Sequence, residues 1–157
     1  MSGEGTIRLE RTGRVSRIVI DRPSKMNSIT PEMANALFGV ADTINDDVDV
    51  RAVVIAGEGS KAFCAGTDLN SLDQYASTWN FRNRRDYAKA IFGIRKPVIA
   101  AMRGFVLGGG LEIALHSDIR IAARSAVFGA SEIRLGWHAG DSTLLLPRLI
   151  GCGEASC

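Results

Sequence analysis

The chain has 157 residues, of which 46% are hydrophobic and 23% charged, and its formal net charge is +2. This composition is typical of one ordinary globular domain. The small net charge and the 6% of aromatic residues give no argument for nucleic-acid binding. No apolar run approaches the roughly 18 residues that a membrane span needs. The first residues also lack the apolar core of a signal peptide, so we expect a cytoplasmic protein that contacts no membrane.

The cysteines predict neither a metal centre nor a disulfide framework. The sequence has only three of them, without CxxC spacing, and only two histidines. Zinc sites and disulfide scaffolds need denser and more regularly spaced ligands. We therefore expect no metal, and only buried or incidental thiols at Cys64, Cys152 and Cys157.

The first half of the chain alternates between strand and helix signals. Residues 6–21 hold two alternating apolar runs around Thr12-Gly13, which predicts a hairpin. Thr30 and Pro31 are typical of a helix start, and apolar positions at helical spacing extend that helix to about residue 45. Residues 51–57 form a continuous apolar run that indicates a buried strand. A glycine-rich loop then leads to a helix expected around residues 68–75.

The second half continues this alternation. Residues 81–94 indicate one helix, with the basic cluster 82–85 interpreted as its solvated face rather than as a phosphate contact. Residues 96–104 and 117–123 indicate two more buried strands, and a loop-rich piece follows. A last helix begins near residue 142, where Pro147 is expected to limit it. Strands that alternate with helices predict an α/β or α+β architecture.

Two glycine-rich stretches, residues 62–69 and 106–113, each place glycine just before a predicted helix. A helix N-terminus carries unpaired N–H groups and partial positive charge, and glycine leaves room for a ligand to reach them. Two converging ends can hold one oxygen on which negative charge develops, as an oxyanion hole does. Phosphate-loop and dinucleotide fingerprints are excluded, because neither GxxxxGK(S/T) nor GxGxxG occurs in these stretches. Close helix packing is the structural alternative.

Two acidic residues accompany these stretches. Glu112 follows the glycine triplet in the first turn of its helix, where a negative charge is favourable by about 0.3–1 kcal/mol in any helix. Glu132 lies between apolar stretches, where a cap or a paired buried carboxylate explains it. Taken alone, each of the two acidic residues is explained by its structural position. Close to an oxyanion hole, however, the two carboxyl groups would form a proton-transfer pair of one base and one acid.

Four pieces of the sequence together resemble the crotonase superfamily, also called the enoyl-CoA hydratase/isomerase family. They are IDRPSKMNSIT, AFCAGTDL, the block KPVIAAMRGFVLGGGLEIALHSDIRIAARSAVFGASEIRLG, and LLPRLIG, in the order and spacing of the family. The resemblance as a whole runs from about residue 6 to 151. The resemblance implies a crotonase-like core domain over residues 1–157, built as a spiral of ββα units. It also implies an acyl-CoA thioester substrate, no metal, and no cofactor beyond the coenzyme A of the substrate.

The resemblance also implies roles for particular residues. The backbone N–H groups of Thr67 and Gly109 would form the oxyanion hole. Glu112 would chiefly activate the water that adds to the β-carbon, and Glu132 would protonate the α-carbon. Further substrate contacts are implied for Lys25, Met26, Cys64, Ala65, Gly66, Asp68, Gly108 and Gly140. Hydration of a trans-2-enoyl-CoA to a 3-hydroxyacyl-CoA, a lyase reaction, is therefore the leading hypothesis.

The segment around Glu132 departs from the hydratase pattern. Ser131 replaces the usual proline of the PEIxLG motif, and Trp137 and Asp141 are unusual at their positions. The chlorobenzoyl-CoA dehalogenases of the superfamily carry a tryptophan and a nucleophilic aspartate in this region, although they lack a match to Glu112. Asp141 is therefore either a nucleophile or, as we favour, the N-cap of the following helix.

Family members continue well beyond the length of this chain, so the sequence predicts a member without the family's C-terminal helical region. A homotrimer or hexamer is expected only with that region, and exposed apolar surface without it. Enoyl-CoA isomerisation, acyl-CoA hydrolysis, decarboxylation and dehalogenation are alternatives to hydration within the family. Binding of an acyl-CoA or a partner without turnover is an alternative of another class. His116 receives no role.

Overall fold

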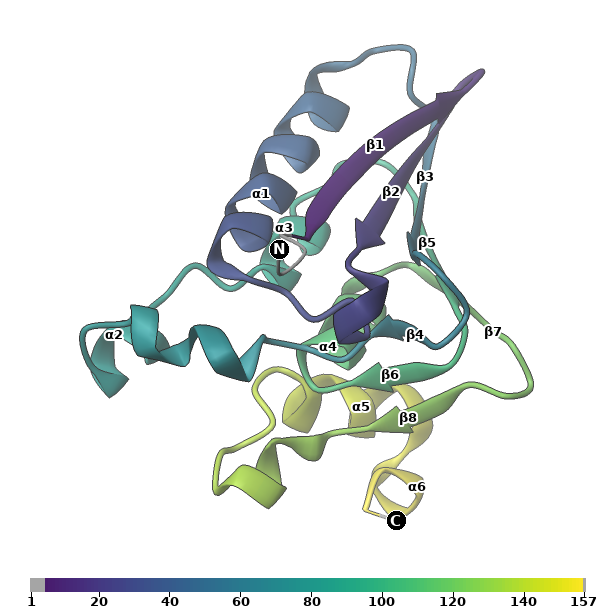
Figure 1. Cartoon of the computed structure of the whole chain (residues 1–157). Helices are drawn as coiled ribbons and strands as arrows, with labels where there is room; N and C mark the ends of the chain where they lie inside the picture. Colours follow the sequence, from purple (N-terminus) through teal and green to yellow (C-terminus); the bar gives the residue numbers. More distant parts are fainter. Residues whose placement is uncertain (1–4, 157) are drawn as a thin grey trace.

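The fold is built from two β-sheets with helices packed around and between them (Figure 1). The computed structural model describes residues 5–156, apart from the side chains of Thr78 and Arg82. The first sheet has five strands in the order β1-β2-β3-β5-β7, and the second has three in the order β4-β6-β8. Within the described residues, β1 and β2 pair antiparallel and the other neighbouring strands pair parallel. The predicted α/β architecture is confirmed.

The five-stranded sheet begins with the predicted hairpin. Its strands β1 (Thr6–Thr12) and β2 (Val15–Asp21) pair from one end to the other around the turn. The sheet continues with β3 (Ala52–Gly57), β5 (Val98–Met102) and β7 (Ile119–Ala122). β3 and β5 each have a neighbour on both sides, which agrees with their unbroken apolar sequences. β7 is a strand as predicted but is exposed rather than buried, because it forms an edge of the sheet.

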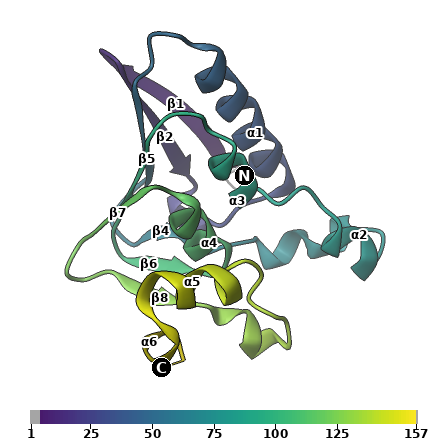
Figure 2. The same cartoon turned by 180° about the vertical axis from the view of Figure 1, so that it is seen from behind.

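Helix α1 (Pro31–Asp46) packs along the sheet, as Figures 1 and 2 show from opposite sides. Oγ1 of Thr30 accepts a hydrogen bond from the N–H of Met33 (3.3 Å), which confirms the predicted N-cap. One stripe of the helix is buried and joins the core that also contains the strand residues Ile18 and Ile55. This stripe consists of Met33, Leu37, Ala41 and Ile44.

The second sheet was not predicted from the sequence, because its strands are too short to show a period. They are β4 (Ala62–Cys64), β6 (Phe105–Leu107) and β8 (Val127–Gly129). Helix α4 (Gly109–His116) starts directly after β6 and contacts β5 of the first sheet as well as β4 and β6 of the second. Nearly all of α4 is buried, so this helix joins the two sheets and fixes the glycine triplet at its start.

Three helical segments differ from expectation. The helix expected over residues 81–94 is two short helices, α2 (Thr78–Arg82) and α3 (Ala88–Phe92), because Asp86 accepts a hydrogen bond from the N–H of Ala88 (3.0 Å) at a new helix start. The helix expected around residues 68–75 is a 3₁₀ helix, η2 (Leu69–Gln74). The last helix, α5 (Ser142–Ile150), continues past Pro147, where it was expected to be limited. The remaining elements are η1 (Pro23–Lys25), η3 (Ser131–Leu135) and α6 (Cys152–Ala155).

Large apolar side chains are exposed on β7, β8, η3 and α5, in agreement with the expected exposed apolar surface. These side chains are Ile119, Ile121, Val127, Phe128, Ile133, Leu135, Leu144, Leu149 and Ile150. In the described part of the chain, no helix is both long enough and apolar enough to span a membrane.

Candidate active site

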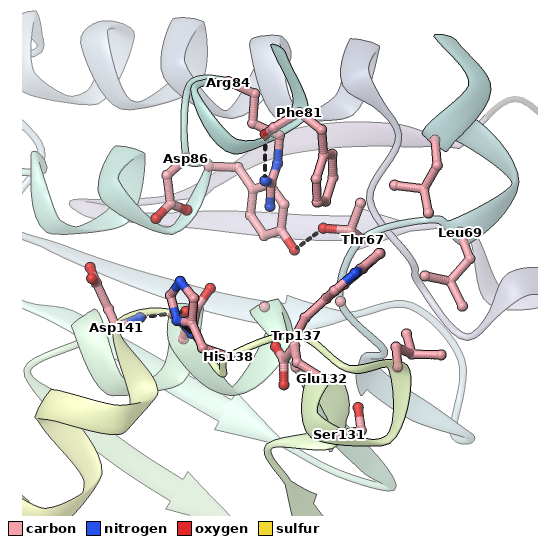
Figure 3. A pocket seen from close by; sticks show the side chains of 18 of the residues that line it. Thr67, Leu69, Phe81, Arg84, Asp86, Ser131, Glu132, Trp137, His138 and Asp141 are labelled. Carbon is pink, nitrogen blue, oxygen red and sulfur yellow. Dashed lines mark hydrogen bonds between the residues drawn. The ribbon is translucent and has the colours of Figure 1, made fainter. Parts of the chain in front are cut away.

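A cavity of about 1090 Å³ lies where the two glycine loops meet η3 and the start of α5 (Figure 3). Most of the predicted site residues line it: Ala65, Gly66, Thr67, Gly108, Gly109, Glu112, Glu132, Trp137, Gly140 and Asp141. Apolar and aromatic side chains supply another part of the lining: Leu69, Leu72, Tyr75, Phe81, Leu135 and Leu144. The fold therefore brings together segments that are far apart in the sequence.

The first glycine loop leaves the backbone N–H of Thr67 unpaired. Ile29 forms an isolated parallel bridge with this loop: its N–H donates to the carbonyl of Gly66 (2.8 Å), and its carbonyl accepts from the N–H of Asp68 (2.9 Å). Successive N–H groups of an extended backbone point to opposite sides, so the N–H of Thr67 is directed away from Ile29. It makes no hydrogen bond with any residue from 5 to 156.

The glycine triplet brings the N-terminus of α4 against that loop. A Cβ on Gly66 would lie 3.0 Å from the backbone nitrogen of Gly109. A Cβ on Gly110 would lie 2.1 Å from the carbonyl oxygen of Cys64, so only glycine lets α4 approach β4 this closely. The N–H of Gly109, in the first turn of the helix, has no acceptor in the described part of the chain. Two unpaired N–H groups from adjacent loops therefore border one cavity.

Glu112 supplies a buried carboxyl group from the first turn of α4. Its Oε1 accepts a hydrogen bond from the backbone N–H of Asp141 (2.7 Å), and 8% of the residue is exposed. Burial raises the pKa of Glu112 to about 7, and the negative charge of Asp86 adds to the rise while the N–H of Asp141 opposes it. The carboxyl group therefore changes charge near neutral pH, as a general base or acid requires.

Glu132 presents a second carboxyl group to the same cavity from η3 (Figure 3). Its Oε1 lies beside the glycine triplet, since a Cβ on Gly108 would be 3.0 Å away from it. Its Oε2 is buried and has no hydrogen-bond partner among the described residues. Burial raises the pKa of Glu132 as well. A buried carboxyl oxygen without a donor favours the protonated form of the group.

Tyr87 closes the cavity beside Gly109, although the sequence analysis did not single it out. Its hydroxyl oxygen lies 3.1 Å from Oγ1 of Thr67, and 2% of the residue is exposed. Burial raises the pKa of Tyr87 well above its ordinary value, so the hydroxyl group keeps its proton. A single tyrosine between charged residues and an apolar helix belongs to no recognisable pattern, so the sequence contains no signal for this position.

Aromatic side chains from two segments meet at the cavity. The ring centroids of Phe81 in α2 and Trp137 after η3 are 5.3 Å apart, and the guanidinium group of Arg84 lies 4.1 Å above the Phe81 ring. Arg84 is therefore half-buried in the lining, which corrects the expectation of a solvated face at this residue, whereas Asn83 and Arg85 are exposed as expected. The side chain of Arg82 lies outside the described residues.

Four predicted contact residues do not line this cavity, namely Lys25, Met26, Cys64 and Asp68. The carboxylate of Asp68 pairs with Arg22 (2.7 Å). The carbonyl of Met26 accepts a hydrogen bond from the N–H of Ala65 (3.0 Å), and Met26 borders a separate cavity of about 310 Å³. Their contacts with a substrate stay predictions.

The two cysteines of the described region, Cys64 and Cys152, are free thiols. Burial raises the pKa of Cys64 to about 12, which makes its thiol unreactive, and Cys152 is exposed. Cys157 lies outside the described residues. Within residues 5–156, no three His, Cys, Asp or Glu side chains are grouped so that they could hold a metal ion.

Asp141 stands at the N-cap position of α5, as predicted, but its side chain does not cap the helix. Its backbone is helical (φ −67°, ψ −18°), whereas a capping residue is normally extended. The carboxylate instead contacts the imidazole of His116, with Oδ2 of Asp141 3.0 Å from Nε2. The predicted side-chain cap is therefore wrong, and His116 has a specific partner.

Known proteins resemble this chain over most of its length. The family model described as enoyl-CoA hydratase/isomerase matches residues 10–156. The chain belongs to the enoyl-CoA hydratase/isomerase family. Relatives in this family include the short-chain-enoyl-CoA hydratase of Clostridium acetobutylicum, 38% identical over 152 residues, and the (E)-benzylidenesuccinyl-CoA hydratase of Thauera aromatica, 37% identical over 147 residues. These alignments cover 94% and 92% of this chain, and 58% and 57% of the two relatives.

Solved structures of enoyl-CoA hydratase/isomerase family members share the fold. The enoyl-CoA hydratase from Bacillus anthracis superimposes with a TM-score of 0.87 at 34% identity, covering 96% of this chain and 60% of that structure. A putative enoyl-CoA hydratase from Streptomyces coelicolor gives a TM-score of 0.86 at 33% identity, covering 96% of this chain and 57% of that one. The predicted membership of the crotonase superfamily is confirmed, and the chain spans a little under three fifths of its curated relatives.

Proposed function

We propose that the chain carries the catalytic groups of an enoyl-CoA hydratase, a lyase that adds water to a trans-2-enoyl-CoA. The supporting observation is that two unpaired N–H groups, of Thr67 and Gly109, and two buried carboxyl groups border one cavity. The carboxyl groups are those of Glu112 and Glu132. The names of the relatives, both hydratases of CoA thioesters, support the same reaction class.

In this proposal the thioester carbonyl oxygen accepts hydrogen bonds from the N–H groups of Thr67 and Gly109. Addition to the β-carbon moves negative charge onto that oxygen as the enolate forms. Donors that already point at the oxygen need no reorganisation, and each stabilises the transition state by about 3 kcal/mol in comparable sites. The glycines at these positions keep side chains out of the space that the carbonyl group needs.

The hydrogen bonds of the two carboxyl groups favour opposite roles in the proton transfers. Glu112 receives an N–H donor, which favours its charged form and suits a base that takes a proton from the attacking water. The water oxygen then bonds to the β-carbon. Oε2 of Glu132 has no partner among residues 5–156, which favours the protonated form and suits an acid that gives its proton to the α-carbon. The product is the 3-hydroxyacyl-CoA.

The proposed substrate is an apolar acyl group carried by coenzyme A. The leucine and aromatic side chains of the lining support an apolar acyl group, and the reaction needs no cofactor beyond the coenzyme A of the substrate. The homotrimer or hexamer and the cytoplasmic location expected from the sequence stay predictions.

Dehalogenation with Asp141 as nucleophile has less support. The carboxylate of Asp141 lines the cavity, but its Oδ2 is held by His116. A nucleophile must instead point at the carbon that it attacks. Glu112, which that chemistry does not require, is also buried against the backbone of Asp141.

The direct test is mass spectrometry of acyl-CoA thioesters after incubation with the purified chain. We expect crotonyl-CoA to gain the mass of one water, and Glu112→Gln to slow this gain by about 10²–10⁴-fold. Loss of halide from a halogenated aroyl-CoA, or release of free coenzyme A, would overturn the hydratase proposal in favour of another family reaction. Bound but unchanged thioesters would identify a binding protein without turnover.

A further inference from the structure

Glu112 and His116 lie four residues apart on α4 and therefore on the same face of that helix. The Glu112 carboxyl group borders the cavity, while the side chain of His116 is 10% exposed. The imidazole also lies next to Phe92 of α3, with ring centroids 5.5 Å apart. The proposed base and this histidine thus share one helix face, and packing restricts the histidine.

Asp141 contacts both residues with different groups. Its backbone N–H donates to Oε1 of Glu112 (2.7 Å), and its Oδ2 lies 3.0 Å from Nε2 of His116. An ionised carboxylate only accepts hydrogen bonds, so Nε2 of His116 carries the proton in this contact. The start of α5 is thereby attached to one face of α4 at two points.

The backbone N–H of Asp141 can act on Glu112 only while this segment keeps its position. No substitution at position 141 other than proline can remove that N–H, so its effect on Glu112 depends on where the backbone lies. Gly140 places this backbone very close to the carboxyl group, because a Cβ there would lie 1.9 Å from Oε1 of Glu112. A shift of the segment by about 1 Å away from Glu112 would take the 2.7 Å contact beyond hydrogen-bonding distance.

From this arrangement we propose that His116 and Asp141 are positioning residues for the base of the reaction. The imidazole of His116 fixes the position of the Asp141 side chain. The fixed side chain keeps the backbone N–H of Asp141 against Glu112, and this N–H orients the Glu112 carboxylate for the attacking water. This inference rests on the proposed hydration. It adds two residues that act through Glu112 rather than on the substrate.

The contacts of Asp141 with His116 and Glu112 also affect the pKa of Glu112. Its carboxyl group faces ionisable groups from several elements, namely Asp86, Tyr87, Glu132 and Asp141. Among these contacts, the N–H of Asp141 favours the charged form of Glu112. The negative charges of Asp86 and Asp141, and that of Glu132 whenever it is ionised, oppose it. Loss of the N–H would therefore raise the pKa of Glu112 further.

The test compares His116→Gln with His116→Asn. Glutamine carries an amide nitrogen where Nε2 of histidine lies, so it can still donate to Asp141, whereas the shorter asparagine cannot reach. Both are neutral amides at the same position. Ser117→Ala is a matched control, because Ser117 is the buried C-cap residue of the same helix and its hydroxyl donates to the carbonyl of Ile113 (3.0 Å). The readouts are kcat, KM and the pKa of Glu112 from NMR titration of labelled glutamate carboxyl carbons.

We expect His116→Asn to lower kcat by about tenfold or more with little change in KM, as a misplaced catalytic group does. We also expect it to raise the pKa of Glu112, whereas His116→Gln and Ser117→Ala keep both values near those of the unsubstituted chain. Equal kcat and equal Glu112 pKa in the two His116 variants would overturn the inference. Unchanged turnover in Glu112→Gln would instead overturn the proposed hydration itself, so the two failures are distinguishable.

Discussion

The hydroxyl oxygen of Tyr87 lies 3.1 Å from Oγ1 of Thr67 and occupies the space into which a side chain at position 109 would project. A Cβ on Gly109 would lie 1.9 Å from this oxygen and 2.7 Å from the ring carbon that carries it. The buried tyrosine therefore explains why the middle residue of the triplet must be glycine. It also connects the two loops whose N–H groups we propose to be the oxyanion hole.

Gly109→Ala is expected to abolish most of the activity. The new methyl group would displace either Tyr87 or the start of α4, and either movement shifts an N–H donor of the proposed oxyanion hole. We expect a fall in kcat on the order of 10²-fold, measured with crotonyl-CoA. Gly39→Ala on α1 is the control, because a Cβ there meets no atom within 4 Å. Full activity in Gly109→Ala would show that Tyr87 does not restrict this position.

Glu112→Gln and Glu132→Gln are each expected to lower kcat by about 10²–10⁴-fold, the range of a lost general base or acid. Glutamine keeps the shape of the side chain, so KM should change little. Hydration rates are measured from the loss of the enoyl chromophore. If only one of the two variants loses activity, the assignment of one base and one acid is wrong.

Glu112 is expected to titrate near pH 7 in an NMR experiment, because burial and neighbouring negative charges raise its pKa to about 7. The base works when ionised, so its contribution to turnover grows as the pH rises through this value. Asp86→Asn removes a like charge and should lower the pKa of Glu112, while the asparagine oxygen can still accept from the N–H of Ala88. Asp73→Asn, at another position of the cavity lining, should leave this pKa unchanged.

Arg22→Ala is expected to lower the free energy of unfolding by about 3 kcal/mol, because it leaves the carboxylate of Asp68 without its partner. The two side chains are 11% and 9% exposed, so water replaces the lost contact poorly. Urea unfolding at neutral pH measures the loss. Arg11→Ala, which breaks the more exposed pair with Asp47, should cost much less.

The same pair predicts a pH dependence of stability. Burial alone would raise the pKa of Asp68, but the hydrogen bonds from Arg22 and Asn70 outweigh it and lower the pKa below its ordinary value. The pair therefore contributes fully above the pKa of an unfolded aspartate, and the contribution is lost as the pH falls through the lower folded value. The free energy of unfolding of the Arg22→Ala variant should therefore depend less on pH in this acidic range than that of the unsubstituted chain.

The sequence alone determined the features that depend on local patterns. Alternating apolar residues identified the hairpin, and the Thr30-Pro31 start with its apolar stripe identified α1. The glycine stretches before predicted helices, with Glu112 and Glu132 beside them, indicated the kind of site and carried the family resemblance. Such signals are readable because each feature is determined by residues only a few positions apart.

Only the tertiary structure decided the features that depend on close contacts between distant segments. The placement of Tyr87 over Gly109, the contact of His116 with Asp141 and the pairing of Asp68 with Arg22 each join residues 22 to 46 positions apart. The three-residue strands of the second sheet depend likewise on their partners. The contacts of Tyr87 with Gly109 and of His116 with Asp141 depend on how α4 packs between the two sheets, and no local period in the sequence records that packing.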